Sequence, residues 1–95
     1  MIILKLSFFA FLQEIFGKER YVSIDGPIRF IELFHLFKSK NGEDGASFFL
    51  DNASLKDGFT ILIDGRNIQA LAKLNTILKE ECEISFFPAI AGGFH

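Results

Sequence analysis

Few side chains in this sequence are of a type that could carry chemistry on their own. The single cysteine, Cys82, excludes an internal disulfide and any metal site built from several cysteines. We interpret Cys82 as a small packed hydrophobic residue and His35, which has apolar neighbours, as part of a helix surface or core edge. We interpret Glu80, Glu81 and Glu83 as a solvated acidic edge, which could also meet a basic partner. Phosphate-binding loops, nucleophile elbows and H-E-x-x-H sequences are absent, so no conventional active site is predicted.

The second chemical feature is the run Phe86-Phe87-Pro88-Ala89-Ile90-Ala91-Gly92-Gly93, which Phe94 and His95 follow. Glycine has no Cβ, so two glycines allow the backbone to approach another surface closely with an unrestricted φ. Taken alone, such a pair is also typical of a frayed terminus. The rest of the sequence is needed to distinguish a functional diglycine from a frayed terminus.

Length and composition limit the classes of protein that fit. The chain has 95 residues, which is enough for a single core, and 49% of them are hydrophobic, which excludes an intrinsically disordered chain. Ten basic and twelve acidic residues are spread evenly, which argues against a nucleic-acid-binding face. Thirteen phenylalanines are many for so small an interior. Either the core is rich in phenylalanine, or some rings form an apolar surface patch for a partner.

The first third of the sequence predicts two neighbouring strands joined by a short helix. Residues 2–8 alternate in hydrophobicity, which puts Ile2, Leu4, Leu6 and Phe8 on one face of a strand. A helix over residues 10–16 is predicted to end at Gly17, which suits a positive φ. Residues 20–24 form the second strand, with Val22 and Ile24 inward. Because no positive charge precedes the N-terminal apolar run and no cleavage site follows it, we expect a cytoplasmic protein rather than an exported one.

The middle of the chain predicts the main helix of the core. Asp25-Gly26-Pro27 resembles a helix start, and we expect the helix to run to about Ser39. Phe30, Leu33, Phe34 and Phe37 would form its apolar stripe. Residues 41–58 look like a loop, in which Phe48-Phe49-Leu50 is either a short strand or a packed insertion.

The last third predicts strands around a tight turn. Residues 59–63 form a strand, Asp64-Gly65 a turn, and residues 66–68 a brief return strand. Leu71, Leu74 and Leu78 suggest a helical turn with a bend. The last strand covers residues 83–87, with Ile84 and Phe86 on one face, and Pro88 ends it. The predicted fold class is α+β, with a mixed sheet of four to five strands packed on one principal helix.

The element order, the run Ile61-Leu62-Ile63-Asp64-Gly65-Arg66-Asn67-Ile68 and the ending Phe86–Gly93 resemble the ubiquitin-like sulfur carriers of the MoaD/ThiS family. The small subunit of molybdopterin synthase is the member that the chain resembles most. The resemblance covers nearly the whole chain and implies the β-grasp fold. It implies a domain over residues 1–88 and a flexible tail with the diglycine over residues 89–95.

The resemblance also implies a chemistry for Gly92 and Gly93. In such carriers an ATP-dependent adenylating enzyme of the ubiquitin-activating type activates the carboxylate of the second glycine, and sulfur then converts it to a thiocarboxylate. The carrier is not an enzyme and holds no cofactor; ATP is used by the activating partner. Here Phe94 and His95 follow Gly93, so the resemblance implies cleavage between Gly93 and Phe94, for example by a JAMM-type metalloprotease.

The resemblance leaves several partners open. Molybdopterin or tungstopterin synthesis, with a partner like the synthase large subunit, is the favoured pathway. Alternatives are sulfur transfer to cysteine, thiamin or a thioacid metabolite, conjugation of Gly93 to other proteins, or an interaction module with an inert tail. The expected partner interface comprises Phe9, Phe87, Pro88, Ile90 and Ala91. No membrane or nucleic-acid partner is expected.

Overall fold

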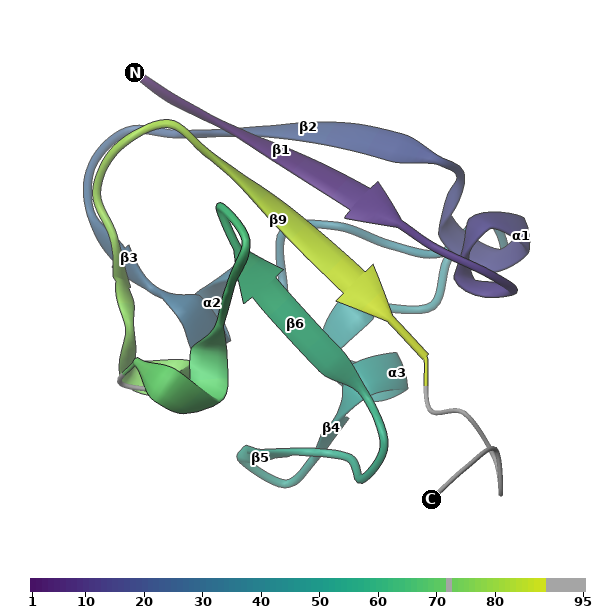
Figure 1. Ribbon diagram of the computed structural model, residues 1–95. Coiled ribbons are helices and arrows are strands. Elements are labelled where there is room, and N and C mark those ends of the chain that lie inside the picture. Colours follow the sequence, from purple (N-terminus) through teal and green to yellow (C-terminus); the bar gives the residue numbers. More distant parts are fainter. Residues whose placement is uncertain (72, 89–95) are drawn as a thin grey trace.

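The computed structural model describes residues 1–71 and 73–88, and its centre is a five-stranded mixed sheet (Figure 1). The strands lie in the order β2 (Glu19–Ile24), β1 (Ile2–Phe8), β9 (Cys82–Phe87), β6 (Thr60–Ile63) and β7 (Arg66–Asn67). β1 and β9 are parallel, and the other neighbouring pairs are antiparallel. The mixed α+β sheet is therefore confirmed.

Three short helices and four two-residue strands complete the fold. The helices are α1 (Leu12–Phe16), α2 (Phe30–Leu33) and α3 (Gly45–Phe49), with 3₁₀ turns η1 (Ile68–Ala70) and η2 (Lys73–Asn75). The short strands form two pairs, β3 (Ile28–Arg29) with β8 (Ile77–Leu78) and β4 (Leu50–Asp51) with β5 (Ser54–Leu55). In this described part of the chain, no helix is long and apolar enough to cross a membrane.

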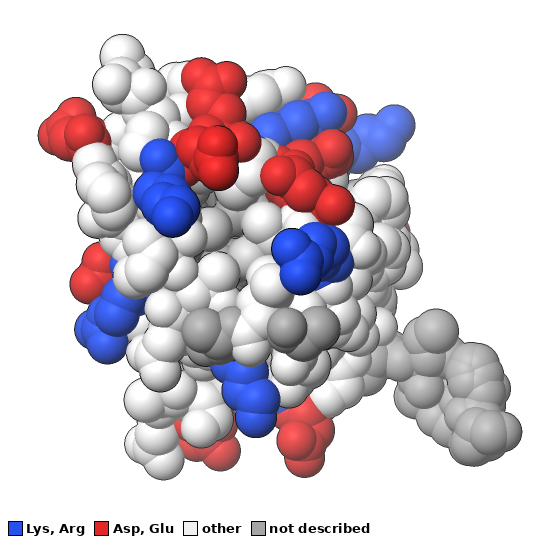
Figure 2. All heavy atoms as spheres, turned by 60° about the vertical axis from the view of Figure 1, so that its left-hand side comes forward, with Lys and Arg blue, Asp and Glu red and all other residues white. Residues whose placement is uncertain are grey.

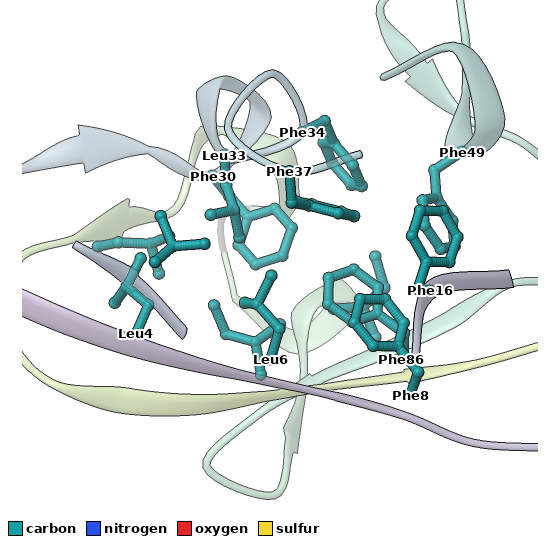
Figure 3. Packing of buried hydrophobic residues seen from close by; sticks show 14 of the residues in the cluster. Leu4, Leu6, Phe8, Phe16, Phe30, Leu33, Phe34, Phe37, Phe49 and Phe86 are labelled. Carbon is teal, nitrogen blue, oxygen red and sulfur yellow. The ribbon is translucent and has the colours of Figure 1, made fainter. Parts of the chain in front are cut away.

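The core lies between one face of the sheet and the segments that contain α2 and α3 (Figure 3). The even-numbered residues of β1 and β9 point into it, as the period-two pattern predicts; Leu4, Leu6, Phe8, Ile84 and Phe86 are buried. Seven of the thirteen phenylalanines are buried, whereas Phe9 and Phe11 are exposed. The core is therefore rich in phenylalanine, and some of the rings lie at the surface; that they form a patch for a partner stays a prediction.

The long helix predicted over residues 27–39 is wrong. Residues 28 and 29 form β3, and only the four residues of α2 are α-helical. β3 pairs with β8, and the backbone N–H of Phe30, the first residue of α2, donates to the carbonyl of Thr76 at 2.7 Å. These long-range bonds hold the chain extended where a local helix would have started. The predicted stripe of Phe30, Leu33, Phe34 and Phe37 is nevertheless buried.

Two other segments differ from the prediction in detail. Residues 41–58, predicted to be a loop, contain α3 and the β4–β5 pair, and the run Phe48-Phe49-Leu50 packs on the core, with Phe49 fully buried. Gly45 opens α3 against the core, where an added Cβ would lie 2.7 Å from the carbonyl oxygen of Phe34. Leu78, predicted to belong to a helical turn, lies in β8 and is buried. The Asp64-Gly65 turn is confirmed, with φ of 49° and 85°.

Candidate functional site

The last strand ends beside the end of β1 (Figure 1). β9 ends at Phe87, and Pro88 follows without an N–H to continue the ladder. Ile90, Ala91, Gly92, Gly93 and Phe94, which the sequence singled out, lie outside the described residues. Their roles and the flexibility of the tail remain predictions.

The structure brings together two of the predicted interface residues, Phe9 and Phe87. Their rings are stacked, with centroids 4.5 Å apart and planes 8° from parallel. The backbone N–H of Phe9 donates to the carbonyl of Phe86 at 3.1 Å, so the parallel pairing continues one residue beyond β1. Phe9 is 36% exposed. A stacked aromatic pair therefore lies on the surface directly before Pro88.

A second aromatic pair lies on the opposite face of the same two strands. Phe8 and Phe86 are buried and stacked, with centroids 4.9 Å apart. Because side chains alternate along a strand, the buried Phe8–Phe86 pair and the surface Phe9–Phe87 pair hold the ends of both strands from the two sides. The point at which the tail begins is thus fixed to the core.

Phe11 is an exposed aromatic residue that the sequence reasoning missed. It is 51% exposed and precedes α1. Between it and Phe9, Ala10 has a φ of 54°, a conformation that costs a residue with a Cβ about 1 kcal/mol or more. A signal was present in the sequence, since Phe11 falls outside the helical stripe of Leu12, Ile15 and Phe16.

Charged side chains cover the open face of the sheet beside the Phe9–Phe87 pair. The Lys5 ammonium lies 3.5 Å from the Glu19 carboxylate and 3.9 Å from that of Glu83. Both carboxylates raise the pKa of Lys5, and Glu19 has the larger effect. The Ser7 hydroxyl, which is buried, donates to Glu83 at 2.8 Å. A pocket of about 190 Å³ lies between these residues and Phe9. On the face drawn in Figure 2, acidic and basic side chains are intermixed.

The single cysteine and His35 lie in different parts of the fold, Cys82 in β9 and His35 two residues after α2. Cys82 is partly buried and packs against the core, as predicted. Its burial is the largest cause that raises the pKa of its thiol to about 11, and the charges of Asp64 and Glu80 contribute less. Cys82 is therefore protonated at neutral pH and is a poor nucleophile. His35 is exposed, with Nδ1 3.2 Å from the Asp44 carboxylate.

The acidic edge is solvated, as predicted: Glu80, Glu81 and Glu83 are all exposed. Within residues 1–71 and 73–88, three or more metal-ligating side chains do not gather at any point.

A family model described as the ThiS family matches residues 6–93 of this chain. The solution structure of small archaeal modifier protein 1 from Methanosarcina acetivorans is similar over 98% of each chain, with 30% identity and a TM-score of 0.70. That of the HVO 2177 protein from Haloferax volcanii is similar over 97% of this chain and 87% of its own, with 26% identity and a TM-score of 0.74.

The crystal structure of small archaeal modifier protein 1 from Haloferax volcanii, at 22% identity, shares the fold over 96% of this chain and 99% of its own, with a TM-score of 0.72. No curated protein matches the sequence. The sheet order and these likenesses confirm the β-grasp fold.

Proposed function

The chain belongs to the ThiS family of ubiquitin-like proteins, and from this premise we propose that it carries sulfur on the carboxyl group of Gly93. The observation that supports this proposal most strongly is the extent of the family match. It runs from residue 6 to Gly93, the second glycine, and leaves Phe94 and His95 outside. The matched region of this chain thus ends at the residue whose carboxyl group the chemistry requires.

Removal of Phe94 and His95 is the first step of the proposal. In the 95-residue chain the carbonyl of Gly93 belongs to a peptide bond with Phe94, and an amide cannot form an acyl-adenylate. Two further residues extend the backbone by up to about 7 Å, so the carboxylate of His95 would miss a site shaped for glycine. A peptidase, for example of the JAMM type, hydrolyses the Gly93–Phe94 bond and frees the carboxylate.

Activation and sulfur transfer follow on a partner enzyme. A carboxylate oxygen of Gly93 attacks the α-phosphorus of ATP, and pyrophosphate leaves. A sulfide-level donor then attacks the carbonyl carbon, AMP leaves, and a thiocarboxylate remains. Gly92 and Gly93 permit the approach to a buried nucleotide because they lack side chains. The carrier contributes reach and a reactive end, and the partners contribute the catalytic groups.

The Phe9–Phe87 pair supports a docking surface for these partners. It lies at the surface directly before Pro88, with Phe9 exposed and Phe87 half-buried, and we assign to Pro88 the direction in which the tail leaves. We assign Phe9, Phe87 and Pro88, together with Ile90 and Ala91 of the tail, to the partner interface. Exposed aromatic residues are enriched in such interfaces because each buries a large area.

Molybdopterin or tungstopterin synthesis is the pathway we favour, with the large subunit of the synthase as acceptor. Sulfur transfer to cysteine, thiamin or a thioacid metabolite would use the same carrier chemistry. The similarity to small archaeal modifier protein 1 favours a second candidate function, in which Gly93 is joined to lysines of other proteins. For both functions we propose a cytoplasmic location and an ATP-dependent activating enzyme as partner.

The test compares the 95-residue chain with a version that ends at Gly93. Each is mixed with ATP, labelled pyrophosphate and the purified adenylating enzyme from the same cells, and pyrophosphate exchange is measured. The version ending at Gly93 is expected to support exchange and the 95-residue chain is not. A version ending at Ala91 is the matched control and should be inactive. Exchange with the untrimmed chain would contradict the processing step.

A further inference from the structure

β2 forms one edge of the sheet and pairs with β1 alone. Its pairing is continuous over six residues, from Glu19 to Ile24, and contains neither a proline nor an interruption of the register. Natural edge strands are usually kept short, bulged or proline-containing, which prevents them from pairing with another chain. β7, at the opposite edge, has only two residues. β2 is therefore the longer and less protected edge of this sheet.

The register shows which backbone groups of β2 point away from β1. The N–H of Phe8 donates to the carbonyl of Lys18, which places the hydrogen-bonded pairs at the even-numbered residues of β2. The N–H and C=O groups of Glu19, Tyr21 and Ser23 consequently point outward. In the part of the chain that the structure describes, none of these groups accepts or donates a hydrogen bond.

The side chains of β2 leave this edge accessible. Val22 and Ile24 are buried in the core, whereas Tyr21 is 64% exposed at the middle of the strand. Apart from Met1, Tyr21 is the most exposed large hydrophobic side chain of the described residues. Its ring buries little within the single chain, so the fold itself does not explain an aromatic residue at this position.

We infer that β2 is a self-association edge, which pairs antiparallel with β2 of a second copy around a two-fold axis at Tyr21. In this register Tyr21 faces Tyr21 of the second copy, and Glu19 faces Ser23. Each hydrogen-bonded pair exchanges two bonds, so about six backbone bonds would join the two chains. A cross-strand aromatic pair adds to their stability.

The charges around β2 select a second copy in the antiparallel orientation. Glu19 at the start of the strand is already paired with Lys5 at 3.5 Å, so the other charges are those of Lys18 and Arg20 at the start and of Asp25 after the end. None of the three takes part in an ion pair among the described residues. Antiparallel pairing brings the basic end of each strand beside the acidic end of the other, and no like charges face each other directly.

This association is compatible with the proposed carrier chemistry but does not depend on it. β1 separates β2 from β9, so pairing at the outer edge of β2 leaves the Phe9–Phe87 pair and the exit of the tail uncovered. A six-residue edge buries less area than a standard interface, and we therefore expect a weak dimer, half-formed between about 10 µM and 1 mM.

Sedimentation equilibrium of the full 95-residue chain tests the inference, together with the variant Tyr21→Pro. Proline removes only an outward-pointing N–H, so the bonds to β1 remain and circular dichroism should stay native. The dissociation constant of the dimer is expected to rise at least about tenfold. Tyr21→Thr, which keeps the N–H, should weaken the dimer less than proline does.

Nuclear Overhauser spectroscopy on a mixture of labelled and unlabelled wild-type protein gives a second readout, which does not require the variant to fold. In the proposed register Arg20 and Val22 of the two copies form a pair without hydrogen bonds, so a cross peak between their α-protons is expected. A protein that stays monomeric at about 1 mM, or a dimer without this cross peak, would overturn the inference. A monomer whose β2 edge instead binds a foreign peptide would overturn it as well.

Discussion

Neighbouring phenylalanines at the end of β9 allow a paired test of how the tail is anchored. Phe86 is fully buried among Phe8, Phe34, Phe37 and Phe49, with ring centroids between 4.9 and 6.4 Å away. Truncation to alanine removes the buried ring and leaves a cavity, which together cost about 3–5 kcal/mol.

Truncation of Phe87 to alanine should cost less free energy of unfolding than truncation of Phe86, because solvent reaches the side of the sheet on which Phe87 lies. Phe87→Ala removes the stacking on Phe9, worth about 0.5–1.5 kcal/mol, and part of the apolar burial, but it leaves no enclosed cavity. We expect the free energy of unfolding to fall by about 1–2.5 kcal/mol. A domain of this size is stable by about 5–10 kcal/mol, so the Phe87 variant stays folded and the Phe86 variant is marginal.

The assay is urea unfolding at 25 °C, followed by far-ultraviolet circular dichroism. With a slope near 1 kcal/mol per molar urea, the midpoint should fall by about 1–2.5 M for Phe87→Ala and by about 3–5 M for Phe86→Ala. Phe87→Glu should likewise keep a native spectrum while it loses binding to the adenylating partner. Equal destabilisation by the two alanine variants, within about 0.5 kcal/mol, would refute the assignment of Phe87 to the surface.

Three further predictions concern other parts of the molecule. In urea melts, Gly45→Ala should lower the free energy of unfolding by about 2 kcal/mol, because its Cβ would lie 2.7–2.9 Å from packed atoms. Gly26→Ala is the control: its Cβ would meet open space, and it should change the free energy of unfolding by less than about 0.5 kcal/mol. Equal effects of the two variants would contradict the packing of α3. Ser7→Ala removes the donor to Glu83 and should cost about 1 kcal/mol by the same assay, and an unchanged midpoint would show that the bond contributes nothing. Alkylation of Cys82 by iodoacetamide at pH 8 should be at least about tenfold slower than that of glutathione and should rise toward pH 11. Because the unfolded thiol ionises first, near pH 9, stability should also fall as pH rises from 9 to 11. Cys82→Ser should lose less over this range, since the raised pKa of Lys5 contributes in both proteins.

The long strands of the central sheet could be predicted because apolar residues alternate with period two along a half-buried strand, whereas β3 and β8 were predicted to be helical. β1, β2 and β9 lie where the alternation of apolar residues placed them, and the Asp64-Gly65 turn lies between β6 and β7. The prediction of a long helix was wrong because an apolar stripe indicates which residues are buried and does not specify the backbone conformation. Phe30 and its neighbours are buried as predicted, but the bond from Phe30 to Thr76 depends on a segment more than forty residues away.

The candidate site was predictable in its residues but not in its geometry. The resemblance pointed to Phe9, Phe87 and the diglycine, and the stacking of Phe9 on Phe87 follows from the parallel register of β1 and β9, which the local sequence does not specify. Phe11 could have been found from its place outside the apolar stripe of Leu12, Ile15 and Phe16, whereas the positive φ of Ala10 before it could not, since alanine rarely adopts that conformation. The outward-pointing N–H and C=O groups of β2 can likewise be identified only once the sheet order is known.

The most direct test of the sulfur-carrier proposal is the intact mass of the protein purified from its own cells. The account predicts a species that ends at Gly93, and in part of the material one oxygen replaced by sulfur. Fragmentation should place that sulfur on the carboxyl group of Gly93. If the protein retains Phe94 and His95 in full while the sulfur-requiring pathway is active, Gly93 is not the reactive end and the carrier proposal is contradicted.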